Sequence, residues 1–164
     1  MKLNPIKICI DNILLDPNNY RFHDLRSWKK VNSSRFHEPK IQEGTAKLLR
    51  DAVEFELSAL KDSIRTNGFV QLEQIVVRPY EAAEGYYVVV EGNRRIAAIK
   101  WLLEDQESGV VTLEQHEIDE FTNLNVLLLD TNEAENINAT EVIMAIRHVS
   151  GIKAWGAYQQ ARLI

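Results

Sequence analysis

The stretch YYVVVEGNRRIAAIKWLL, residues 86–103, constrains the fold of this chain more than any other. A run rich in Val and Tyr, typical of a β-strand, leads directly into Glu91-Gly92-Asn93-Arg94-Arg95, and an apolar pattern of helical period follows. Free backbone N–H groups and the positive end of the dipole meet at a helix N-terminus, and Gly92 lets a ligand approach the backbone closely. Arg94 and Arg95 add forked donors that match phosphate oxygens. The stretch therefore predicts a phosphate-binding turn between a strand and a helix.

The composition is that of one compact domain. The chain has 164 residues, 45% of them hydrophobic, which is enough to bury a sizeable core. Its formal net charge of −5 argues against a simple basic module for duplex DNA. Residues 21–35 nevertheless carry five Arg or Lys against one Asp, and this basic, aromatic stretch could meet nucleic acid locally. We favour a solvated loop as the interpretation of this stretch.

The N-terminus and the single cysteine indicate a cytoplasmic protein without a membrane partner. The opening MKLNPIKICIDN lacks the apolar core of a signal peptide, and no apolar run is long enough to span a bilayer. Cys9 cannot form an intramolecular disulfide, which fits a reducing compartment, and its apolar neighbours predict a small buried residue. His23, His37 and His116 lack metal-ligand spacing with an acidic or cysteine partner, so no metal cluster is predicted.

Strand patterns and helix patterns are mixed along the chain without a regular alternation. Strand patterns occupy residues 6–15, 75–77, 86–90 and 126–129. Helix patterns occupy residues 45–67, 94–104, 139–149 and 155–164, with Thr45 as the expected N-cap of the first and Asn67-Gly68 as its end. Residues 20–42 are typical of a long polar loop with one helical turn, and residues 107–123 of an irregular region. The mixture predicts an α+β, or irregular α/β, domain with a small mixed sheet packed against helices.

Several segments in order resemble the N-terminal domain of ParB-like proteins, a fold shared with sulfiredoxin. GFVQ at residues 68–71 precedes the strand IVV, and VVVEGNRRIAAIKWL follows. Upstream, IDNILLDPNNYRF is similar to the segment that brings an arginine to the same pocket. Downstream, VLLLD and MAIRHVSGIKAWGAYQQARLI are similar to the closing strand and the helices that lead to a helix-turn-helix domain. The resemblance leaves out residues 23–43, and it implies a nucleotide-binding core over residues 1–130 and a helical segment over 131–164 that continues into a further domain.

The resemblance also implies where a nucleotide would lie. The glycine–arginine turn cradles phosphates in this family, which assigns the phosphates here to Gly92, Asn93, Arg94, Arg95 and Arg21. The GFVQ turn lies against the base or sugar, which assigns that side to Gly68, Phe69 and Gln71. The RHVSG stretch lies beside the pocket, which makes Arg147, His148 and Ser150 candidate wall residues. Two bland alternatives stay open, since a turn Gln71 can satisfy its own backbone and His148 can be a favourable dipole contact at a helix C-terminus.

Two departures from the family pattern weaken the case for catalysis. The family usually has an acidic residue where this chain has Asn93, and a metal-associated Glu-Asn pair is replaced by Arg147-His148. Glu91 is the alternative catalytic or metal-binding acid, although it could equally hold Arg95 in place. Cations in the first turn of a helix oppose the macrodipole by up to about 1 kcal/mol, so an anion partner is favoured for the two arginines of the turn. The cysteine of the sulfiredoxin glycine motif is absent, which excludes that activity.

Three functions follow as hypotheses. The first is a domain that binds a nucleoside triphosphate of unspecified base, with Mg²⁺ as a companion ion, and that controls a DNA-binding or DNA-acting region beyond this chain, with homodimerisation as an option. The second is an enzyme in which Glu91 acts with Arg94 and Arg95, with nucleoside triphosphate hydrolysis ranked ahead of nuclease or kinase activity. The third is a module that docks DNA or protein and has lost nucleotide hydrolysis. A helix-turn-helix beyond Ile164 would indicate DNA partitioning or transcriptional control, and a nuclease-like domain would indicate bacterial defence.

Overall fold

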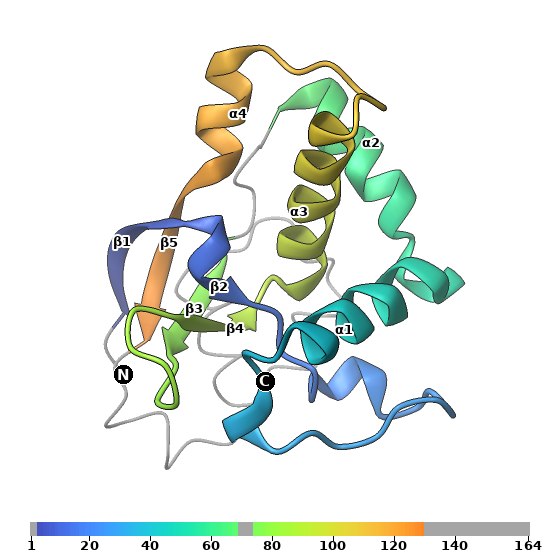
Figure 1. The fold of residues 1–164 in the computed structure, drawn as a ribbon, viewed down its shortest axis with the longest axis vertical. Helices are drawn as coiled ribbons and strands as arrows, with labels where there is room; N and C mark the ends of the chain where they lie inside the picture. Colours follow the sequence, from blue (N-terminus) through green and yellow to red (C-terminus); the bar gives the residue numbers. More distant parts are fainter. Residues whose placement is uncertain (1–2, 69–73, 130–164) are drawn as a thin grey trace, which may run out of the picture.

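A five-stranded mixed sheet forms the centre of the domain (Figure 1). The computed structural model describes residues 3–68 and 74–129. The strands are β1 (Leu3–Cys9), β2 (Ile13–Leu14), β3 (Val76–Pro79), β4 (Tyr87–Glu91) and β5 (Asn123–Leu129), in the spatial order β1-β5-β3-β4-β2. The β1–β5 and β3–β4 pairs are antiparallel, whereas the β3–β5 and β2–β4 pairs are parallel. The predicted strands are present, but a 3₁₀ turn, Ile10–Asn12, divides the first into β1 and β2, and Cys9 is half-buried rather than buried.

Helices pack against one face of this sheet (Figure 1). They are α1 (Pro39–Asp51), α2 (Leu57–Asn67), α3 (Asn93–Glu107) and α4 (Gln115–Thr122). The central helix is α3, which contacts the other three and fully buries Ile96, Ala98 and Ile99. Among the described residues, no helix combines the length and the apolar character that crossing a membrane requires. The predicted α+β class, a mixed sheet packed with helices, is therefore confirmed.

The strand β4 contributes to both faces of the sheet. Successive side chains of a strand point to opposite faces. Val89 is buried in the main core together with Ile96 of α3. Val88 belongs to a second cluster on the other face, where Phe36 and Tyr80 cover it. The strand and helix predicted from residues 86–103 are thus anchored on both sides, which holds the turn between them in place.

The apolar stripe over residues 45–67 does not form one helix. It is divided between α1 and α2 by a 3₁₀ turn, Val53–Phe55, and by Glu56. Glu56 has a left-handed backbone conformation with φ of 47°, which interrupts the helical path. The bend turns both Phe55 and Leu57 into the core. An apolar pattern of helical period does not distinguish one long helix from two short helices joined by a bend.

The predicted N-cap at Thr45 is also wrong. Helix α1 begins at Pro39, which suits the first helical position because its missing N–H has no partner there in any case. Thr45 is buried within the helix, and its hydroxyl donates to the carbonyl oxygen of Ile41 at 2.8 Å. The polar run before Thr45 carries no apolar period, so the first turn and a half of α1 gave no pattern to detect.

Residues 107–123, predicted to be irregular, contain helix α4. A capping box begins this helix: the side chain of Glu114 accepts from the backbone N–H of Glu117, and the side chain of Glu117 accepts from the backbone N–H of Glu114 at 2.9 Å. Phe121 anchors the helix in the core. The usual capping residue is Ser, Thr, Asp or Asn, and a Glu in that role explains why the helix was missed.

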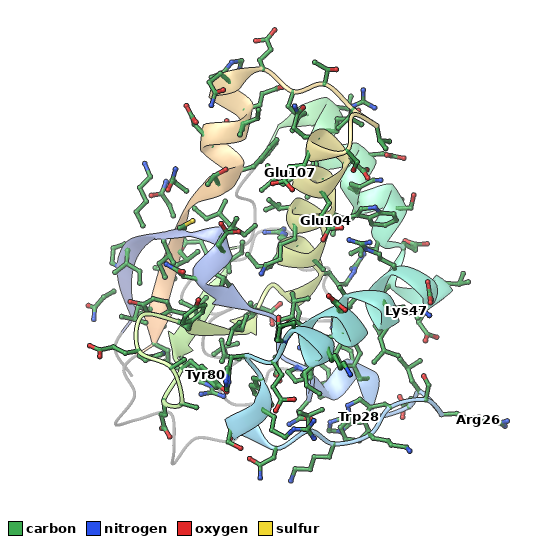
Figure 2. The ribbon with its side chains drawn as sticks, viewed as in Figure 1. Arg26, Trp28, Lys47, Tyr80, Glu104 and Glu107 are labelled. Carbon is green, nitrogen blue, oxygen red and sulfur yellow. The ribbon has the colours of Figure 1, made fainter. Side chains whose placement is uncertain are left out.

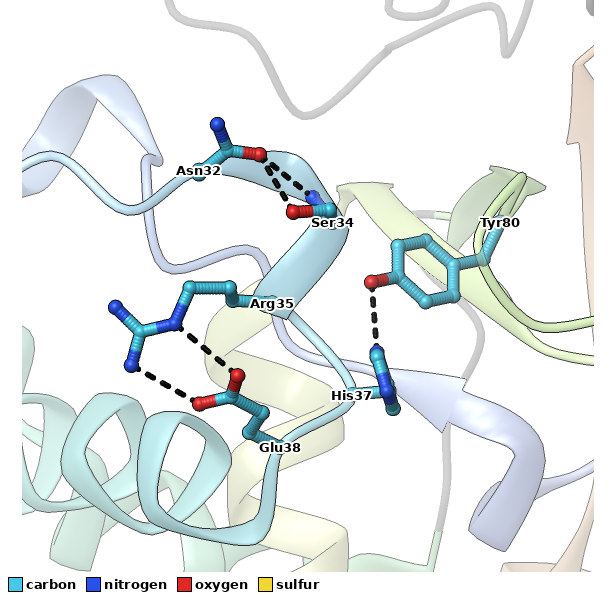
Figure 3. Close-up of polar contacts among 6 residues, drawn as sticks. All are labelled: Asn32, Ser34, Arg35, His37, Glu38 and Tyr80. Atoms are coloured by element: carbon cyan, nitrogen blue, oxygen red, sulfur yellow. Dashed lines mark hydrogen bonds and ion pairs between the residues drawn. The ribbon is translucent and has the colours of Figure 1, made fainter.

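The polar segment 20–42 is folded rather than open (Figure 3). Part of it is held against the residue that follows β3, since the ring nitrogen Nδ1 of His37 lies 3.0 Å from the hydroxyl of Tyr80. Arg35 donates two hydrogen bonds to Glu38, at 3.1 and 3.0 Å, just before α1 begins. This pair is exposed and adds little stability by itself. The segment therefore has a defined path along the domain and can hold a site residue in a fixed position.

Candidate functional site

The turn between β4 and α3 depends on Gly92. Its φ of 110° belongs to a region that residues with a side chain rarely adopt. A Cβ atom at this position would lie 3.0 Å from Cγ1 of Ile75, closer than such atoms normally approach. Because both the backbone and the space exclude a side chain, the glycine is what allows the chain to turn from the sheet directly into α3.

A pocket lies beside this turn. Its described walls come from the loop after β2, from α1, α2 and the bend between them, and from the β4–α3 turn. The lining residues are Asn19, Arg21, Phe22, Leu49, Phe55, Leu60, Gln74, Glu91, Gly92, Asn93, Arg94 and Arg95. They enclose about 160 Å³, less than the roughly 300–1,000 Å³ of pockets that hold a whole drug-sized ligand. The described part of the site therefore suits a fragment of a ligand, such as a phosphate chain.

Positive charge predominates in the pocket. Arg21, Arg94 and Arg95 line it, and Glu91 is the one carboxylate among the described lining residues. Arg94 and Arg95 stand in the first turn of α3, where the helix itself contributes partial positive charge. Cations and a helix N-terminus on one cavity form an arrangement that an anion stabilises.

Arg21 reaches the pocket on an anchored loop. The neighbouring Phe22 is buried and packs edge-on against Phe55, with 5.7 Å between the ring centroids. The side chain of Asn19 accepts the backbone N–H of Arg21 at 3.0 Å and begins the short helical turn Tyr20–Phe22. The structure thus brings Arg21 beside the glycine–arginine turn, although the two segments are far apart in the sequence.

The side chain of Asn93 is already engaged by the protein. It is 6% exposed, its Oδ1 accepts the backbone N–H of Asp16 at 2.9 Å, and its Nδ2 donates to the carbonyl oxygen of Asp16 at 2.9 Å. The Oδ1 atom and one of the two Nδ2 hydrogens of Asn93 are therefore used within the protein.

The carboxyl of Asp16 lies in the same loop and is perturbed by its surroundings. Burial raises its pKa, while the backbone N–H of Asn18, which donates to the carboxylate at 2.9 Å, and the charges of Arg78 and His23 lower it. Burial is the larger effect. The loop that carries Arg21 therefore contains a carboxyl that holds its proton to a higher pH than an exposed aspartate.

The other predicted site residues are placed only in part. Gly68 ends α2 with φ of 73°, and it is exposed. Phe69, Gln71, Arg147, His148 and Ser150 lie outside the described residues. Their roles on the nucleoside side and as pocket wall stay predictions.

Sequence reasoning missed half of the described lining. The missed residues are Asn19, Phe22, Leu49, Phe55, Leu60 and Gln74. Leu49 and Leu60 lie in the helix pattern over residues 45–67, and no sequence signal separates a core leucine from one that also borders a cavity. Asn19 carried a signal, since Asn side chains commonly accept the backbone N–H of the residue two positions later.

Metal ligands are sparse in this part of the chain. Within residues 3–68 and 74–129, no group of three or more His, Cys, Asp or Glu side chains is placed to hold a metal ion. A divalent ion at the pocket would have Glu91 as its carboxylate ligand among the described lining residues and would depend on oxygens brought by a ligand.

The fold and the pocket define an α+β domain with a cationic cavity at a strand–glycine–helix turn. Residues 28–130 match the family model of the ParB N-terminal domain, and the chain belongs to this family. Among solved structures, it is similar to the C-terminally truncated chromosome-partitioning protein ParB from Caulobacter crescentus, complexed with CTP-gamma-S. The two chains are 16% identical, and the match covers 88% of this chain and 62% of that chain with a TM-score of 0.39. No curated protein matches the chain.

Proposed function

We propose that this domain binds a nucleoside triphosphate, with the phosphate chain at the N-terminus of α3. The observation that carries the proposal is that Arg21, Arg94 and Arg95 line one pocket together with that helix N-terminus. Guanidinium forks and free helix N–H groups are the combination that suits phosphate oxygens. Membership of the ParB N-terminal domain family supports a nucleotide as the ligand, as the resemblance implied.

Each group has a separate task in this binding mode. The backbone at Gly92 and the first N–H groups of α3 bind phosphate oxygens, because Gly92 lines the pocket where the chain turns into the helix. Arg94 and Arg95 neutralise the phosphates from the helix side, and Arg21 does so from the loop after β2. Mg²⁺ commonly binds through substrate phosphates and one or two carboxylates, and Glu91 is the carboxylate among the described lining residues.

The nucleotide would act as a signal to an attached DNA-binding or DNA-acting region. The pocket joins the loop after β2, the α1–α2 bend and the start of α3, which are distant in the sequence. A ligand shifts a conformational equilibrium only to the extent that it binds one conformation better. A phosphate chain held by Arg21 of the loop and by the start of α3 would favour the conformation in which these two parts are close together, and this preference would be the signal.

Titration calorimetry tests the proposal directly. ATP, CTP, GTP and UTP are titrated with and without Mg²⁺, together with inorganic tripolyphosphate and the matching nucleosides. We expect at least one triphosphate to bind, tripolyphosphate to bind more weakly, and the nucleosides alone to show no binding, because the phosphates carry the charge that the arginines recognise. Absence of binding by all four triphosphates at about 1 mM, which corresponds to about 4 kcal/mol of binding free energy, would contradict the proposal.

Hydrolysis is a separate question that Glu91 can answer. We expect the wild-type protein to bind nucleotide without measurable turnover, because the family's usual acid is replaced by Asn93, whose amide is engaged by Asp16. Phosphate release is measured with the wild-type protein and with Glu91→Gln. Release that Glu91→Gln abolishes, with nucleotide affinity retained, would establish the enzymatic alternative in place of simple binding.

A second candidate function, docking of DNA, rests on the basic part of the loop after β2. Arg26, Lys29 and Lys30 are exposed and have no ion-pair partner within the described part of the chain, and Figure 2 shows Arg26 directed away from the domain. Trp28 anchors this part of the loop, since its indole N–H donates to the carbonyl oxygen of Pro17 at 2.9 Å.

Duplex binding measured by fluorescence anisotropy at several salt concentrations tests this second candidate. Replacing the three cations by Gln should weaken binding and reduce the salt dependence by roughly one unit of slope for each phosphate that is no longer neutralised. Binding that is unchanged in the triple variant would exclude the loop as the DNA-binding surface.

A further inference from the structure

The amide of Asn93 joins two walls of the pocket. Asn93 is the first residue of α3, next to the two arginines of the turn, and it is buried. Its two hydrogen bonds, both 2.9 Å long, end on the N–H and the C=O of Asp16, which lies 77 positions earlier in the chain. A side-chain amide that pairs with both polar groups of one backbone residue holds that residue in position as well as orientation.

Asp16 is in turn the start of the loop that carries Arg21. The carboxylate of Asp16 accepts the N–H of Asn18, and its carbonyl oxygen lies 3.4 Å from the N–H of Asn19, which closes a turn. Asn19 then caps the short helical turn that presents Arg21. The path from the α3 N-terminus to Arg21 therefore consists of hydrogen bonds between Asn93 and Asp16, between Asp16 and the next residues, and between Asn19 and Arg21.

A carboxylate at position 93 could not make both of these bonds. An ionised Asp has two acceptor oxygens and no donor, so it could still accept the N–H of Asp16 but would oppose a second oxygen to the carbonyl of Asp16 at the 2.9 Å contact. Two acceptors at that distance repel each other, and the carbonyl of Asp16 would keep only the longer 3.4 Å contact with the N–H of Asn19. The amide of Asn93 is thus matched to this loop, and an acid at this position conflicts with it.

We propose that Asn93 is a positioning residue, which sets nucleotide affinity by holding the Arg21 loop against the phosphate turn and not by contact of its side chain with the nucleotide. This inference rests on the proposed function, since it assigns the means by which Arg21 joins the same site. It also accounts for an amide where the resemblance implies an acid, because only the amide can both accept the N–H and donate to the C=O of Asp16.

A double-mutant cycle on nucleotide affinity tests the inference. Asn93→Ala, Arg21→Gln and the double variant are titrated with the triphosphate that binds the wild-type protein most tightly. We expect each single variant to bind about tenfold more weakly, and the double variant to bind no more than about tenfold more weakly as well. Arg21 contributes only while the two hydrogen bonds between Asn93 and Asp16, called the Asn93–Asp16 latch below, hold its loop in place. Additive losses of about 100-fold in the double variant, or an unchanged affinity in Asn93→Ala, would overturn the inference.

Two further variants separate positioning from general stability. Asn93→Asp, which keeps the size of the side chain, should lose affinity as Asn93→Ala does. Gln42 offers a matched control, because its amide pairs in the same way with the N–H and C=O of Leu15, at 2.8 and 3.0 Å, but ties that residue to α1. Gln42→Ala should lower the melting temperature, and its loss of affinity should add to that of Arg21→Gln instead of masking it.

Amide hydrogen exchange tests the latch without any nucleotide. In Asn93→Ala, the N–H groups of residue 16 and of residues 18–23 should exchange at least about tenfold faster than in the wild-type protein, while those of the core strand β4 keep their protection. Unchanged exchange in this loop would overturn the inference even if nucleotide binds. Faster exchange in a protein that binds no triphosphate would instead leave the latch standing and refute the proposed function.

Discussion

The two ends of α3 both carry charges that the helix dipole disfavours. A helix has partial positive charge at its N-terminus and partial negative charge at its C-terminus. Arg94 and Arg95 stand in the first turn, and Glu104 and Asp105 stand near the other end, where Figure 2 marks Glu104. Each end therefore carries charges of the sign that the dipole disfavours there. What differs between the two ends is which groups surround these charges.

At the C-terminal end, neighbouring helices supply the partners. Arg50 of α1 donates to Glu104 at 2.6 Å, and Lys61 of α2 donates to Asp105 at 2.7 Å. Both cations also lie over the ring of Trp101, at 4.6 and 3.9 Å from its centroid, where the negative face of the ring attracts them. These contacts, called the Trp101 joint below, connect α1 and α2 to the C-terminal end of α3.

At the N-terminal end, the cations surround a cavity. Arg94 and Arg95 share it with Arg21, against the single described carboxylate of Glu91. The comparison shows that charge opposed to the dipole is not in itself evidence of a ligand site, because ion pairs between helices explain it at the other end. The evidence at the N-terminal end is the excess of cations around a pocket, and the following predictions test whether the two ends differ in this way.

The largest effect is expected on ligand affinity from the first turn. Arg94→Gln combined with Arg95→Gln should weaken triphosphate binding by about 100-fold or more, since charge-assisted hydrogen bonds contribute about 1.5–3 kcal/mol each. Calorimetry measures this loss. The control is Arg26→Gln, an exposed arginine outside the pocket, which should leave affinity within about twofold at physiological salt. A loss of similar size in the control would mean that net charge, not the pocket, attracts the nucleotide.

Trp101→Ala should show the opposite profile at the other end of the helix. Its half-buried ring and two cation contacts predict a loss of about 3 kcal/mol in the free energy of unfolding, measured by urea denaturation. Triphosphate affinity well below the melting transition should change by less than about threefold. A large loss of affinity without a loss of stability would show that the joint belongs to the ligand site and would remove the contrast between the ends.

Gly92→Ala should affect both readouts. A left-handed backbone and a Cβ atom 3.0 Å from Ile75 predict a loss of about 2 kcal/mol in the free energy of unfolding and a weaker phosphate site. Gly44 is the matched control, because it lies within α1 with open space around it. Gly44→Ala should stabilise the protein by about 0.5–1 kcal/mol. Equal effects of the two substitutions on unfolding would contradict the special geometry of the turn.

The smallest effect concerns Asp16 and appears only as a change with pH. Burial raises the pKa of this carboxyl above its ordinary value of 3.8, so the folded protein binds a proton more tightly than the unfolded chain. Its contribution to stability is complete below that ordinary value and is lost as pH rises through the folded pKa. Asp16→Asn lacks this loss, so its free energy of unfolding should increase relative to the wild-type protein as pH rises from about 3 through the folded pKa and then stay level. Parallel pH profiles of the two proteins would exclude a raised pKa.

Much of the fold followed from local patterns, and the exceptions have a common cause. The runs at β3, β4 and β5 are apolar enough to be found as strands, and the strand–turn–helix unit was placed within one residue or a few at each end. The single helix expected over residues 45–67 proved to be α1, a bend and α2. Phe55 and Glu56 produce the bend because Phe55 enters the core against Phe22, and that packing joins segments distant in sequence.

The candidate site divides in the same way. Glu91, Gly92, Arg94 and Arg95 form one continuous motif, and local physics was enough to predict that they meet. The position of Arg21 came only from the resemblance to a family, and the part of Asn93 was not foreseen at all. Both hydrogen bonds of the Asn93 side chain end on the backbone of Asp16. Because nearly every residue has the same backbone groups, the sequence does not indicate which one such a side chain will bind.

By itself, the sequence determined that a strand runs through a glycine turn into a helix with two arginines, because propensity, apolar period and the conformational freedom of glycine all act within a few residues. Tertiary structure alone decided what surrounds that turn. Packing of the loop after β2 and of the α1–α2 bend against α3 makes a cavity in front of the arginines, and the amide of Asn93 holds one wall to the other. Such interactions depend on the distance between segments in the folded chain, which no local pattern encodes.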